Sequence, residues 1–484
     1  MNAAEILLGR EALGRHGQRT AIICGEEKLT FDELADRVAR ASGAFAALGV
    51  RPGERVLFLM RDTPQFAIAW LAAVRCGAVA VALNNKLSDA DVSHVVAESR
   101  PRVAIQDDAF AERRLSGVQS QRISRFTELA RRSSPIPAYA ADAESPAFML
   151  YSSGTTGRPK GIVHAHRGFA ALGAAFRFIG IGEGDRVFTT SRYFFAYGLE
   201  HGLLATLAVG ATAVLYPDWP DTEAVIETVS RHRPAAMFSV PTTYRRLLAE
   251  PRTRLAPFRA MRRFVAGGER LSRPLVEQWR AAVGGELLNL YGMSETFCAC
   301  MMTPPGSSDG LRTGLPFDGV QVELREGVLW VKHPAQAVGY DNLPEQTHEQ
   351  FRDGWFCSRD IFLRDAEGHY VHQGRSDELI KIAGQWVQPA ELEDVAARES
   401  AVSEAACVPV PDEDGLERLA LFVTASADPA AAQRAALEAC ERALPRHKRP
   451  KWVRTVKELP RTATGKIQRF RLREILEREL SARD

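Results

Sequence analysis

The sequence predicts an α/β fold with a large N-terminal domain of parallel and mixed sheets flanked by helices, a β-rich subdomain, and a small α+β C-terminal domain. Three observations lead to this class. The chain has 484 residues, too many for one ordinary hydrophobic core, so about two to four domains are expected. Short apolar segments alternate with helical patterns up to about residue 266, as in repeated βα units. Strand patterns dominate from about residue 314, and a shorter strand–helix alternation follows residue 374.

Local patterns predict the elements of the first part of the chain. Residues 20–24 are rich in β-formers, and Thr30 with Glu33 makes a capping box that opens a helix ending at Gly49. We expect further strands at 55–60, 78–83, near 103, and at 186–190, 211–216, 235–240 and 264–266. We expect further helices at 64–76, from 88, and at 222–232 and 242–249. The Arg- and Ser-rich segment 113–137 is expected to be a surface excursion.

The second part of the chain divides into a β-rich segment and a small α+β domain. The β-rich segment has strand patterns at 320–324, 328–332, 354–360 and 369–373. The last segment has strand patterns at 379–382, 406–409 and 419–424, and helical patterns at 389–398, 429–444 and 470–480. A glycine and a run of charged residues separate the two segments, so we predict domains at 1–376 and 377–484.

Composition narrows the class of protein. Apolar residues make up 45% and charged residues 25%, a balance typical of soluble globular proteins, and the net charge of +2 argues against binding nucleic acid through a bulk positive field. The seven cysteines form no CxxC pair, and no histidine cluster has metal-ligand spacing. Neither a signal peptide nor a membrane span is recognisable, so a cytoplasmic location is expected. The chain has only nine lysines but 53 arginines, so each lysine indicates a position where arginine was not sufficient.

The segment 151–161, Tyr-Ser-Ser-Gly-Thr-Thr-Gly-Arg-Pro-Lys-Gly, carries the strongest chemical motif. It follows an apolar strand pattern, its glycines allow close backbone approach, and its hydroxyl groups can donate to phosphate oxygens. The usual P-loop pattern GxxxxGK[ST] is not satisfied, so a different phosphate-binding loop is predicted. The candidate residues are Ser152, Ser153, Gly154, Thr155, Thr156, Gly157 and Lys160.

Four further motifs follow along the chain. They are Tyr-Gly-Met-Ser-Glu-Thr at 291–296, Gly-Trp-Phe-Cys-Ser-Arg-Asp at 354–360, Gly-Arg-Ser-Asp-Glu-Leu-Ile-Lys at 374–381, and Pro-Arg-Thr-Ala-Thr-Gly-Lys-Ile at 460–467. Together with 151–161, and over essentially the whole chain, they resemble the adenylate-forming enzymes: acyl- and aryl-CoA ligases, peptide-synthetase adenylation domains and luciferases. One departure is that this family more often has Thr-Gly before the aspartate that stands here at 360.

The resemblance implies an enzyme that uses ATP, Mg²⁺ and coenzyme A. Lys466 would be catalytic, bridging the substrate carboxylate and the α-phosphate, and Glu295 would hold Mg²⁺. The C-terminal domain would be mobile and would rotate about Asp377 after adenylation, so that CoA can attack the adenylate. Asp360 would bind the ribose, Arg375 the nucleotide, and Lys381 and Trp386 would approach the CoA side. The other residues implied on the nucleotide side are Gly268, Glu269, Tyr291, Gly292, Met293, Ser294 and Thr296.

The segment 193–199, Tyr-Phe-Phe-Ala-Tyr-Gly-Leu, resembles most the benzoate-type aryl-CoA ligases. An aromatic wall suits a flat ring, although an aromatic core patch is the simpler interpretation of such a run. Benzoate ligases usually carry a histidine and a large aliphatic residue where this chain has the smaller Cys298 and Ala299. A roomier pocket, and hence a substituted or elongated aromatic acid, is therefore predicted. The predicted pocket residues are Phe195, Ala196, Tyr197, Gly292, Cys298 and Ala299.

An AMP-forming acid–thiol ligase is thus the leading interpretation, with a carboxylic acid and CoA as small-molecule partners. Loading of a carrier protein, activation of a medium- or long-chain fatty acid, and luciferase-like oxygenation remain alternatives, because the motifs serve all of them. A non-catalytic nucleotide-binding regulator would be expected to lack one of the motif residues, and none is lost. Neither nucleic acid nor a membrane is expected as a partner, and a homodimer is compatible with the sequence.

Overall fold

The computed structural model describes residues 1–153, 159–382, 385–461 and 467–481. This described part of the chain divides into two compact units. The first comprises Met1–Glu323 with Trp330–Ser358, and the second comprises Leu324–Leu329 with Arg359–Asp484. The division thus falls after Ser358, whereas the sequence suggests a domain boundary after residue 376. That boundary remains a prediction.

A large mixed sheet forms the centre of the first unit. Most neighbouring strands are parallel, and β2, β14 and β15 pair antiparallel at the two edges. The interior strands β10 and β11 are buried along their whole length, as expected where both faces of a sheet are covered. From one edge to the other the strands are β15 (Leu315–Pro316), β14 (Met301–Met302), β13 (Leu287–Tyr291), β12 (Arg263–Gly267), β11 (Ala236–Ser239), β9 (Arg186–Thr189), β10 (Thr212–Leu215), β1 (Thr20–Cys24) and β2 (Glu27–Thr30).

A second mixed sheet stands beside the first in the same unit. Strands β7 and β8 pair antiparallel, and this hairpin brackets the predicted phosphate loop. In strand order the sheet contains β18 (Gly339–Tyr340), β8 (Pro159–Ala165), β7 (Pro146–Ser153), β4 (Val79–Ala82), β3 (Arg55–Leu59), β5 (Val103–Gln106) and β6 (Gln119–Arg122).

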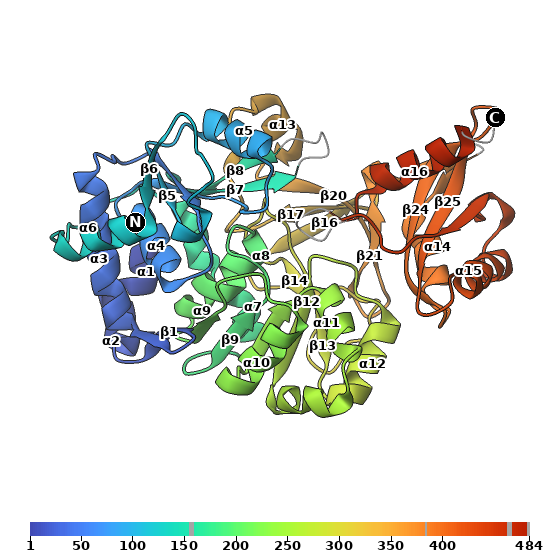
Figure 1. Ribbon diagram of the computed structural model, residues 1–484, viewed down its shortest axis with the longest axis horizontal. Coiled ribbons are helices and arrows are strands. Elements are labelled where there is room, and N and C mark those ends of the chain that lie inside the picture. The colour runs from blue at the N-terminus through green and yellow to red at the C-terminus, as the bar shows by residue number, and fades with distance from the viewer. Residues whose placement is uncertain (154–158, 383–384, 462–466, 482–484) are drawn as a thin grey trace. The chain divides into compact units, whose positions relative to one another are not determined.

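The main apolar core lies between these two sheets, together with α3 and α4. Successive residues of a strand face opposite sides, so Val56 and Phe58 of β3 join this core, whereas Leu57 and Leu59 join a cluster with α5. On the other face of the large sheet, α10, α11 and α12 bury their apolar faces (Figure 1). The fold class predicted from the sequence is therefore confirmed.

The helices that the sequence predicts for the first unit are present as α3, α4, α5, α10 and α11. The capping box is present, since Thr30 Oγ1 accepts from Glu33 N at 3.2 Å and Glu33 Oε2 accepts from Thr30 N at 2.8 Å. The helices are α1 (Ala3–Leu8), α2 (Arg10–His16), α3 (Phe31–Ala47), α4 (Pro64–Arg75), α5 (Asp89–Ser99), α6 (Ile123–Arg132), α7 (Ala174–Phe178), α8 (Ala196–Leu199), α9 (Ala205–Ala208), α10 (Thr222–His232), α11 (Pro241–Leu248), α12 (Arg273–Val283) and α13 (Pro344–Gln350). Shorter turns are the 3₁₀ segments Asp108–Phe110, His166–Ala171 and Arg252–Ala260, and the π-helical turn Glu200–Leu204, hereafter the π-turn.

The prediction that residues 113–137 form a surface excursion is wrong in part. Strand β6 pairs in parallel with β5, and α6 follows it directly. Helix α6 buries Ile123, Phe126 and Ala130, which are spaced three and four residues apart on one face. Four of the residues that suggested an exposed loop occupy the solvent face of this amphipathic helix, namely Ser124, Arg125, Arg131 and Arg132.

The chain passes between the units along β16 (Gln321–Arg325), β17 (Val328–Lys332) and β20 (Trp355–Arg364). In the first unit β20 pairs antiparallel with β19 (Phe351–Arg352), and in the second with β21 (Tyr370–Arg375). A 3₁₀ turn at Ser376–Glu378 then leads into a small hairpin of β22 (Ile380–Ile382) and β23 (Gln385–Val387).

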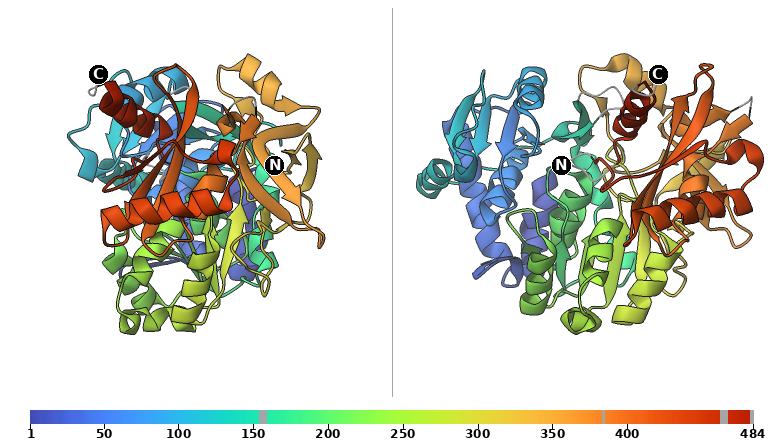
Figure 2. Two further views of the ribbon diagram at one scale, coloured as in Figure 1. Left: turned by 90° about the vertical axis from the view of Figure 1, so that its right-hand side faces the viewer. Right: turned by 45° about the vertical axis from the view of Figure 1, so that its right-hand side comes forward.

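The rest of the second unit is a small α+β domain. Its sheet contains β24 (Val402–Pro411), β25 (Glu417–Ala425) and β26 (Trp452–Thr455). Helices α14 (Pro389–Ala396) and α15 (Pro429–Ala443) cover one face, and α16 (Arg469–Ser481) covers the other (Figure 2). Successive side chains of β25 point to opposite faces of the sheet, so this strand contributes to an apolar core on each face. Leu419 and Leu421 face α15, whereas Ala420 and Phe422 face α16. A short 3₁₀ turn at Arg446–Lys448 precedes β26.

Candidate active site

The predicted phosphate loop connects two paired strands. Ser152 stands opposite Lys160, and Ser153 opposite Pro159, at the open end of the β7–β8 hairpin. Residues 154–158, which include the predicted Gly154, Thr155, Thr156 and Gly157, lie outside the described residues, and so do residues 462–466 with the predicted catalytic Lys466. The roles of these residues remain predictions.

Lys160, Glu295 and Tyr340 form a polar cluster, hereafter the Lys160 cluster. Lys160 Nζ lies 3.7 Å from Glu295 Oε1 and 3.8 Å from the centroid of the Tyr340 ring. The Tyr340 hydroxyl donates to Glu295 Oε1 at 2.9 Å. The cluster therefore joins residues from β8, the segment after β13, and β18, and it holds the Glu295 carboxylate in a fixed place. Sequence motifs did not indicate Tyr340, since only strand pairing brings it to Glu295.

The donor chemistry of the Lys160 cluster fits Mg²⁺ and a polyphosphate. Carboxylate oxygens are the protein ligands that Mg²⁺ prefers, and a lysine ammonium is a compact charge for phosphate oxygens. A magnesium ion bound to Glu295 would draw charge from the phosphates of ATP. The side chains of Lys160 and Glu295 are 19% and 14% exposed, so both are partly shielded from solvent. Reduced solvent contact strengthens such electrostatic interactions.

Replacement of Glu295 by Gln tests this assignment. We expect acid-dependent pyrophosphate release to fall at least about tenfold at low Mg²⁺, and to recover partly as Mg²⁺ is raised, because a carboxamide binds the ion less tightly. The control is Glu286→Gln, a glutamate of the same unit that accepts from the N–H groups of Gly306 and Ser308. An unchanged Mg²⁺ dependence in Glu295→Gln would contradict the metal-binding role.

The predicted adenine segment forms a tight turn after β13. Cys300 N donates to Tyr291 O at 2.8 Å, Thr296 N to Met293 O at 3.2 Å and Phe297 N to Ser294 O at 3.2 Å. A Cβ atom at Gly292 would lie only 3.0 Å from Ala299 Cα, a tight contact that favours glycine at this position. The hydroxyl of the buried Thr296 lies 3.1 Å from Met293 O and 3.0 Å from Cys298 O, and its single proton is donated to one of these carbonyls at a time. The hydrogen bonding of Thr296 stabilises the turn. A role of Thr296 in binding the nucleotide remains a prediction.

The predicted wall of the acyl pocket comes from two separate parts of the first unit. Phe195, Ala196 and Tyr197 start α8 and are half-buried. The Tyr197 hydroxyl lies 3.1 Å from Ser239 O and 3.3 Å from Val265 O, at the carboxyl ends of β11 and β12. Burial raises the pKa of Tyr197 well above its usual value, so its ring stays neutral.

Cys298 and Ala299 provide the second part of this wall and are almost fully buried. Both follow the Glu295 turn directly, so one turn carries the predicted metal ligand and the predicted acyl-pocket residues. Two further predicted residues, Gly268 and Glu269, follow β12. Gly268 has a positive φ of 79°, and Glu269 Oε2 accepts from Thr242 at the start of α11. The binding roles of these residues remain predictions.

In the second unit, the predicted ribose and nucleotide residues lie opposite each other on β20 and β21. Asp360 pairs with Arg375, and Asp360 Oδ1 lies 3.7 Å from the Arg375 guanidinium and 3.4 Å from His372 Nε2. Arg375 also binds Asp377 through two hydrogen bonds, Nε to Oδ1 at 2.8 Å and Nη2 to Oδ2 at 2.9 Å. Burial acts to raise the pKa of Asp377, but the hydrogen bonds and charge of Arg375 outweigh it and hold that pKa below its usual value.

The two residues predicted on the CoA side share the β22–β23 hairpin. Lys381 and Trp386 are register partners, and Lys381 Nζ lies 5.7 Å from the centroid of the Trp386 ring. The Trp386 side chain is 61% exposed, which is unusual for so large an apolar group. An exposed indole with a neighbouring cation is suited to contact a ligand, and the CoA assignment remains a prediction.

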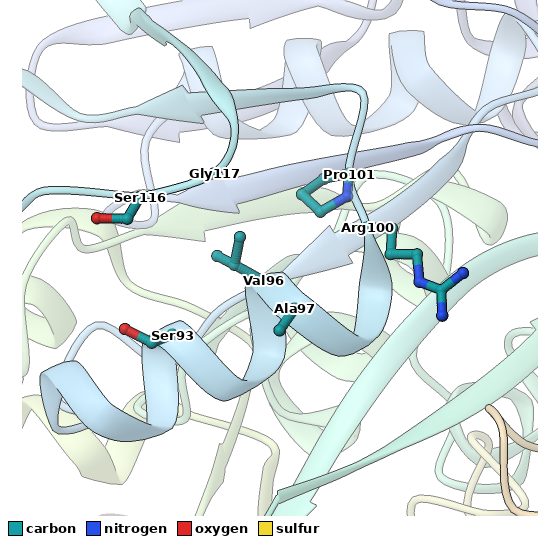
Figure 3. Close-up of a pocket in the computed structure, with 7 residues that line it drawn as sticks. All are labelled: Ser93, Val96, Ala97, Arg100, Pro101, Ser116 and Gly117. Carbon is teal, nitrogen blue, oxygen red and sulfur yellow. The ribbon is translucent and has the colours of Figure 1, made fainter.

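A separate shallow pocket lies beside α5. It has a volume of about 320 Å³ and is lined by Ser93, Arg100 and Ser116 among others (Figure 3). It contains none of the predicted site residues. Among the described residues, no helix combines the length and apolar character needed to cross a lipid bilayer.

Comparison with known proteins places the chain in a family. The model described as "AMP-binding enzyme" matches residues 9–340, and the model "AMP-binding enzyme C-terminal domain" matches residues 391–466. A 3-hydroxybenzoate–CoA/4-hydroxybenzoate–CoA ligase of Thauera aromatica is 39% identical over 99% of this chain and 98% of its own length.

Solved structures agree with this placement. An anthranilate CoA ligase in complex with anthranoyl-AMP has a TM-score of 0.92 at 30% identity and covers 99% of this chain and 98% of its own. A benzoate CoA ligase from Burkholderia xenovorans has a TM-score of 0.90 at 34% identity and covers 98% of this chain and 100% of its own. The chain therefore belongs to the AMP-binding enzyme family of adenylate-forming enzymes, in the group of the aryl-CoA ligases.

Proposed function

We propose that this protein joins a substituted aromatic carboxylic acid to coenzyme A in two steps, with ATP and Mg²⁺. In the first step the carboxylate attacks the α-phosphate of ATP, and pyrophosphate leaves. In the second step the CoA thiol attacks the acyl carbon, and AMP leaves. Two anions must meet in the first step, which explains the need for Lys160, Lys466 and a metal ion near the reacting groups.

One observation supports this proposal most directly: a single turn carries the predicted metal ligand and the predicted acyl-pocket residues. Glu295 belongs to the Lys160 cluster, while Cys298 and Ala299 follow it by three and four residues, and the Ala299 backbone packs against Gly292. A nucleotide and an acyl group held at such a turn would be close enough to react, because bound reactants gain from proximity and orientation. The relatives named above act on hydroxybenzoate, benzoate and anthranilate, all aromatic acids.

A panel of carboxylic acids tests the function. Purified protein is incubated with ATP and Mg²⁺, with and without CoA, and acyl-adenylates and thioesters are identified by mass spectrometry. We expect thioesters of substituted benzoates. If acyl-adenylates form without thioesters and the acyl group is transferred to a carrier protein, that result would support a carrier protein as the acceptor. Thioesters of alkanoic acids alone would show a fatty acyl-CoA synthetase.

The small side chains at 298 and 299 make a second prediction. We expect Ala299→Ile to lower kcat/KM for substituted benzoates at least about tenfold relative to benzoate, because added methyl groups would occupy the space for the substituent. The KM for ATP serves as the internal control and should stay unchanged. If wild-type protein turns over benzoate faster than every substituted acid, the argument from pocket volume fails.

A further inference from the structure

Glu200 is a buried acid that the sequence motifs did not indicate. It follows α8 and starts the π-turn, in which Ala205 N donates to Glu200 O, five residues back. Its side chain is 3% exposed and lies among residues of the main apolar core. Such single π-helical turns inside helices are frequent at functional sites. An ionisable residue at this place therefore calls for a chemical explanation.

The carboxyl group of Glu200 contacts the predicted acyl-pocket wall. Ala299 N lies 3.1 Å from Glu200 Oε2 and 3.3 Å from Oε1, and the Cys298 thiol is a second hydrogen-bonding neighbour. Burial raises the pKa of Glu200 to about 8, although these two hydrogen bonds act against the increase. At neutral pH the group is then mainly a carboxylic acid, which carries an O–H donor as well as acceptor oxygens.

His201 adds an acceptor beside this acid. Its Nδ1 lies 3.0 Å from the carbonyl oxygen of Tyr197, which can only accept, so Nδ1 carries the proton and Nε2 keeps a lone pair. Within the part of the chain that the structure describes, Nε2 is buried and has no hydrogen-bond partner. The ring stacks on Phe238 at 4.5 Å and lies 5.0 Å from the Tyr197 ring. Burial lowers the pKa of His201 to about 3, so the ring is neutral.

Buried polar groups are normally paired, because leaving them unpaired is unfavourable. Here a carboxylic acid and an unpaired imidazole nitrogen are adjacent residues, with His201 Nδ1 3.4 Å from Glu200 Oε2. They contact Tyr197, Cys298 and Ala299, which are the residues predicted to line the acyl pocket. A phenolic hydroxyl can donate to one such group and accept from the other, whereas a methyl group can do neither.

We propose that Glu200 and His201 form a hydrogen-bonding site for a hydroxyl substituent on the ring of the aromatic acid. This inference rests on the proposed function, and it names the substituent that the pocket accepts. The two side chains act as specificity-determining residues, while ATP and the reacting carboxylate are bound elsewhere.

The experiment compares each hydroxybenzoate isomer with the methylbenzoate of the same ring position, which has nearly the same shape. kcat/KM is measured for wild type, His201→Phe, Glu200→Leu and Glu200→Gln. We expect wild type to prefer one hydroxy isomer over its methyl analogue at least about 100-fold, since a site built to hydrogen-bond a hydroxyl rejects the analogue that lacks it. His201→Phe and Glu200→Leu should each lower this ratio at least about tenfold. Glu200→Gln keeps an acceptor for Ala299 N, so it should retain more of the hydroxyl-to-methyl preference.

The matched control is Thr206→Val. The Thr206 hydroxyl donates to His201 O at 2.6 Å, so this variant alters the π-turn without removing either proposed recognition group. Its hydroxyl-to-methyl ratio should equal that of wild type. His201→Phe conserves an aromatic ring and keeps the test valid if Glu200→Leu does not fold.

The outcomes separate the inference from the proposed function. Equal turnover of hydroxy and methyl acids by wild type would overturn the inference and leave the ligase function standing. A parallel loss for all acids in both variants, with an unchanged ratio, would show a purely structural pair and also overturn it. If wild type activates no aromatic acid, the proposed function itself fails. Aminobenzoates, as a second set, would show whether an amino donor replaces the hydroxyl.

Discussion

Lys466→Ala is expected to lower acid-dependent pyrophosphate release by about two to three orders of magnitude, while thioester formation from a preformed acyl-adenylate is largely spared. Lys466 is predicted to stabilise charge in the first transition state, and removal of one such group typically has an effect of this size. The second half-reaction breaks the acyl–phosphate bond, and under the predicted rotation of the C-terminal domain this lysine would no longer contact the reacting atoms. The measurements are pyrophosphate release and single-turnover thioester formation.

Lys457→Ala is the matched control, because Lys457 is an exposed lysine of the same unit outside every motif. We expect it to retain wild-type rates in both half-reactions. Equal losses of both half-reactions in Lys466→Ala would argue against the separate roles and would point to a general effect on the C-terminal unit.

Asp377→Pro is expected to leave adenylation near the wild-type rate and to lower thioester formation on the order of 100-fold, as for a misplaced catalytic group. Asp377 lies in the short turn between β21 and β22, where the resemblance places the pivot. Proline fixes φ near −65° and restricts the residue before it, so a rotation that requires a change in these dihedral angles is blocked. The two half-reactions are measured separately by mass spectrometry.

Asp377→Ala separates this backbone effect from the loss of the side chain. It removes the two hydrogen bonds from Arg375 but leaves φ free. We therefore expect Asp377→Ala to form the thioester much faster than Asp377→Pro. If alanine and proline have the same effect, the Arg375 pair and not the pivot explains the loss. Intact overall turnover in Asp377→Pro would rule out the pivot.

Much of the local structure could be predicted because it depends on neighbours along the chain. The capping box of Thr30 and Glu33 predicted the start of α3, and apolar segments predicted most of the interior strands, although not β8 or β13. Strand β6 and helix α6 were missed because charged residues on the solvent face hide the short apolar pattern of Ile123, Phe126 and Ala130. The three motif lysines, Lys160, Lys381 and Lys466, stood out among many arginines, and their roles as point charges remain predictions.

Contacts between distant segments could not be predicted. Tyr340 reaches Glu295 only because β18 pairs with β8, and Phe297 keeps a left-handed φ of 56° while its ring packs 4.7 Å from Phe148. No sequence motif indicated Glu200, and only the π-turn places its carboxyl group against Ala299 N.

The sequence alone therefore determined the family, the fold class and many of the elements, because motifs and periodicity are local properties. Only the tertiary structure decided which side chains share one environment, since burial and pairing depend on residues far apart along the chain. Burial is decisive for Glu200 and His201, because both would be ordinary polar residues if their side chains were exposed. Buried together beside the predicted acyl wall, they become candidates for selecting the substrate.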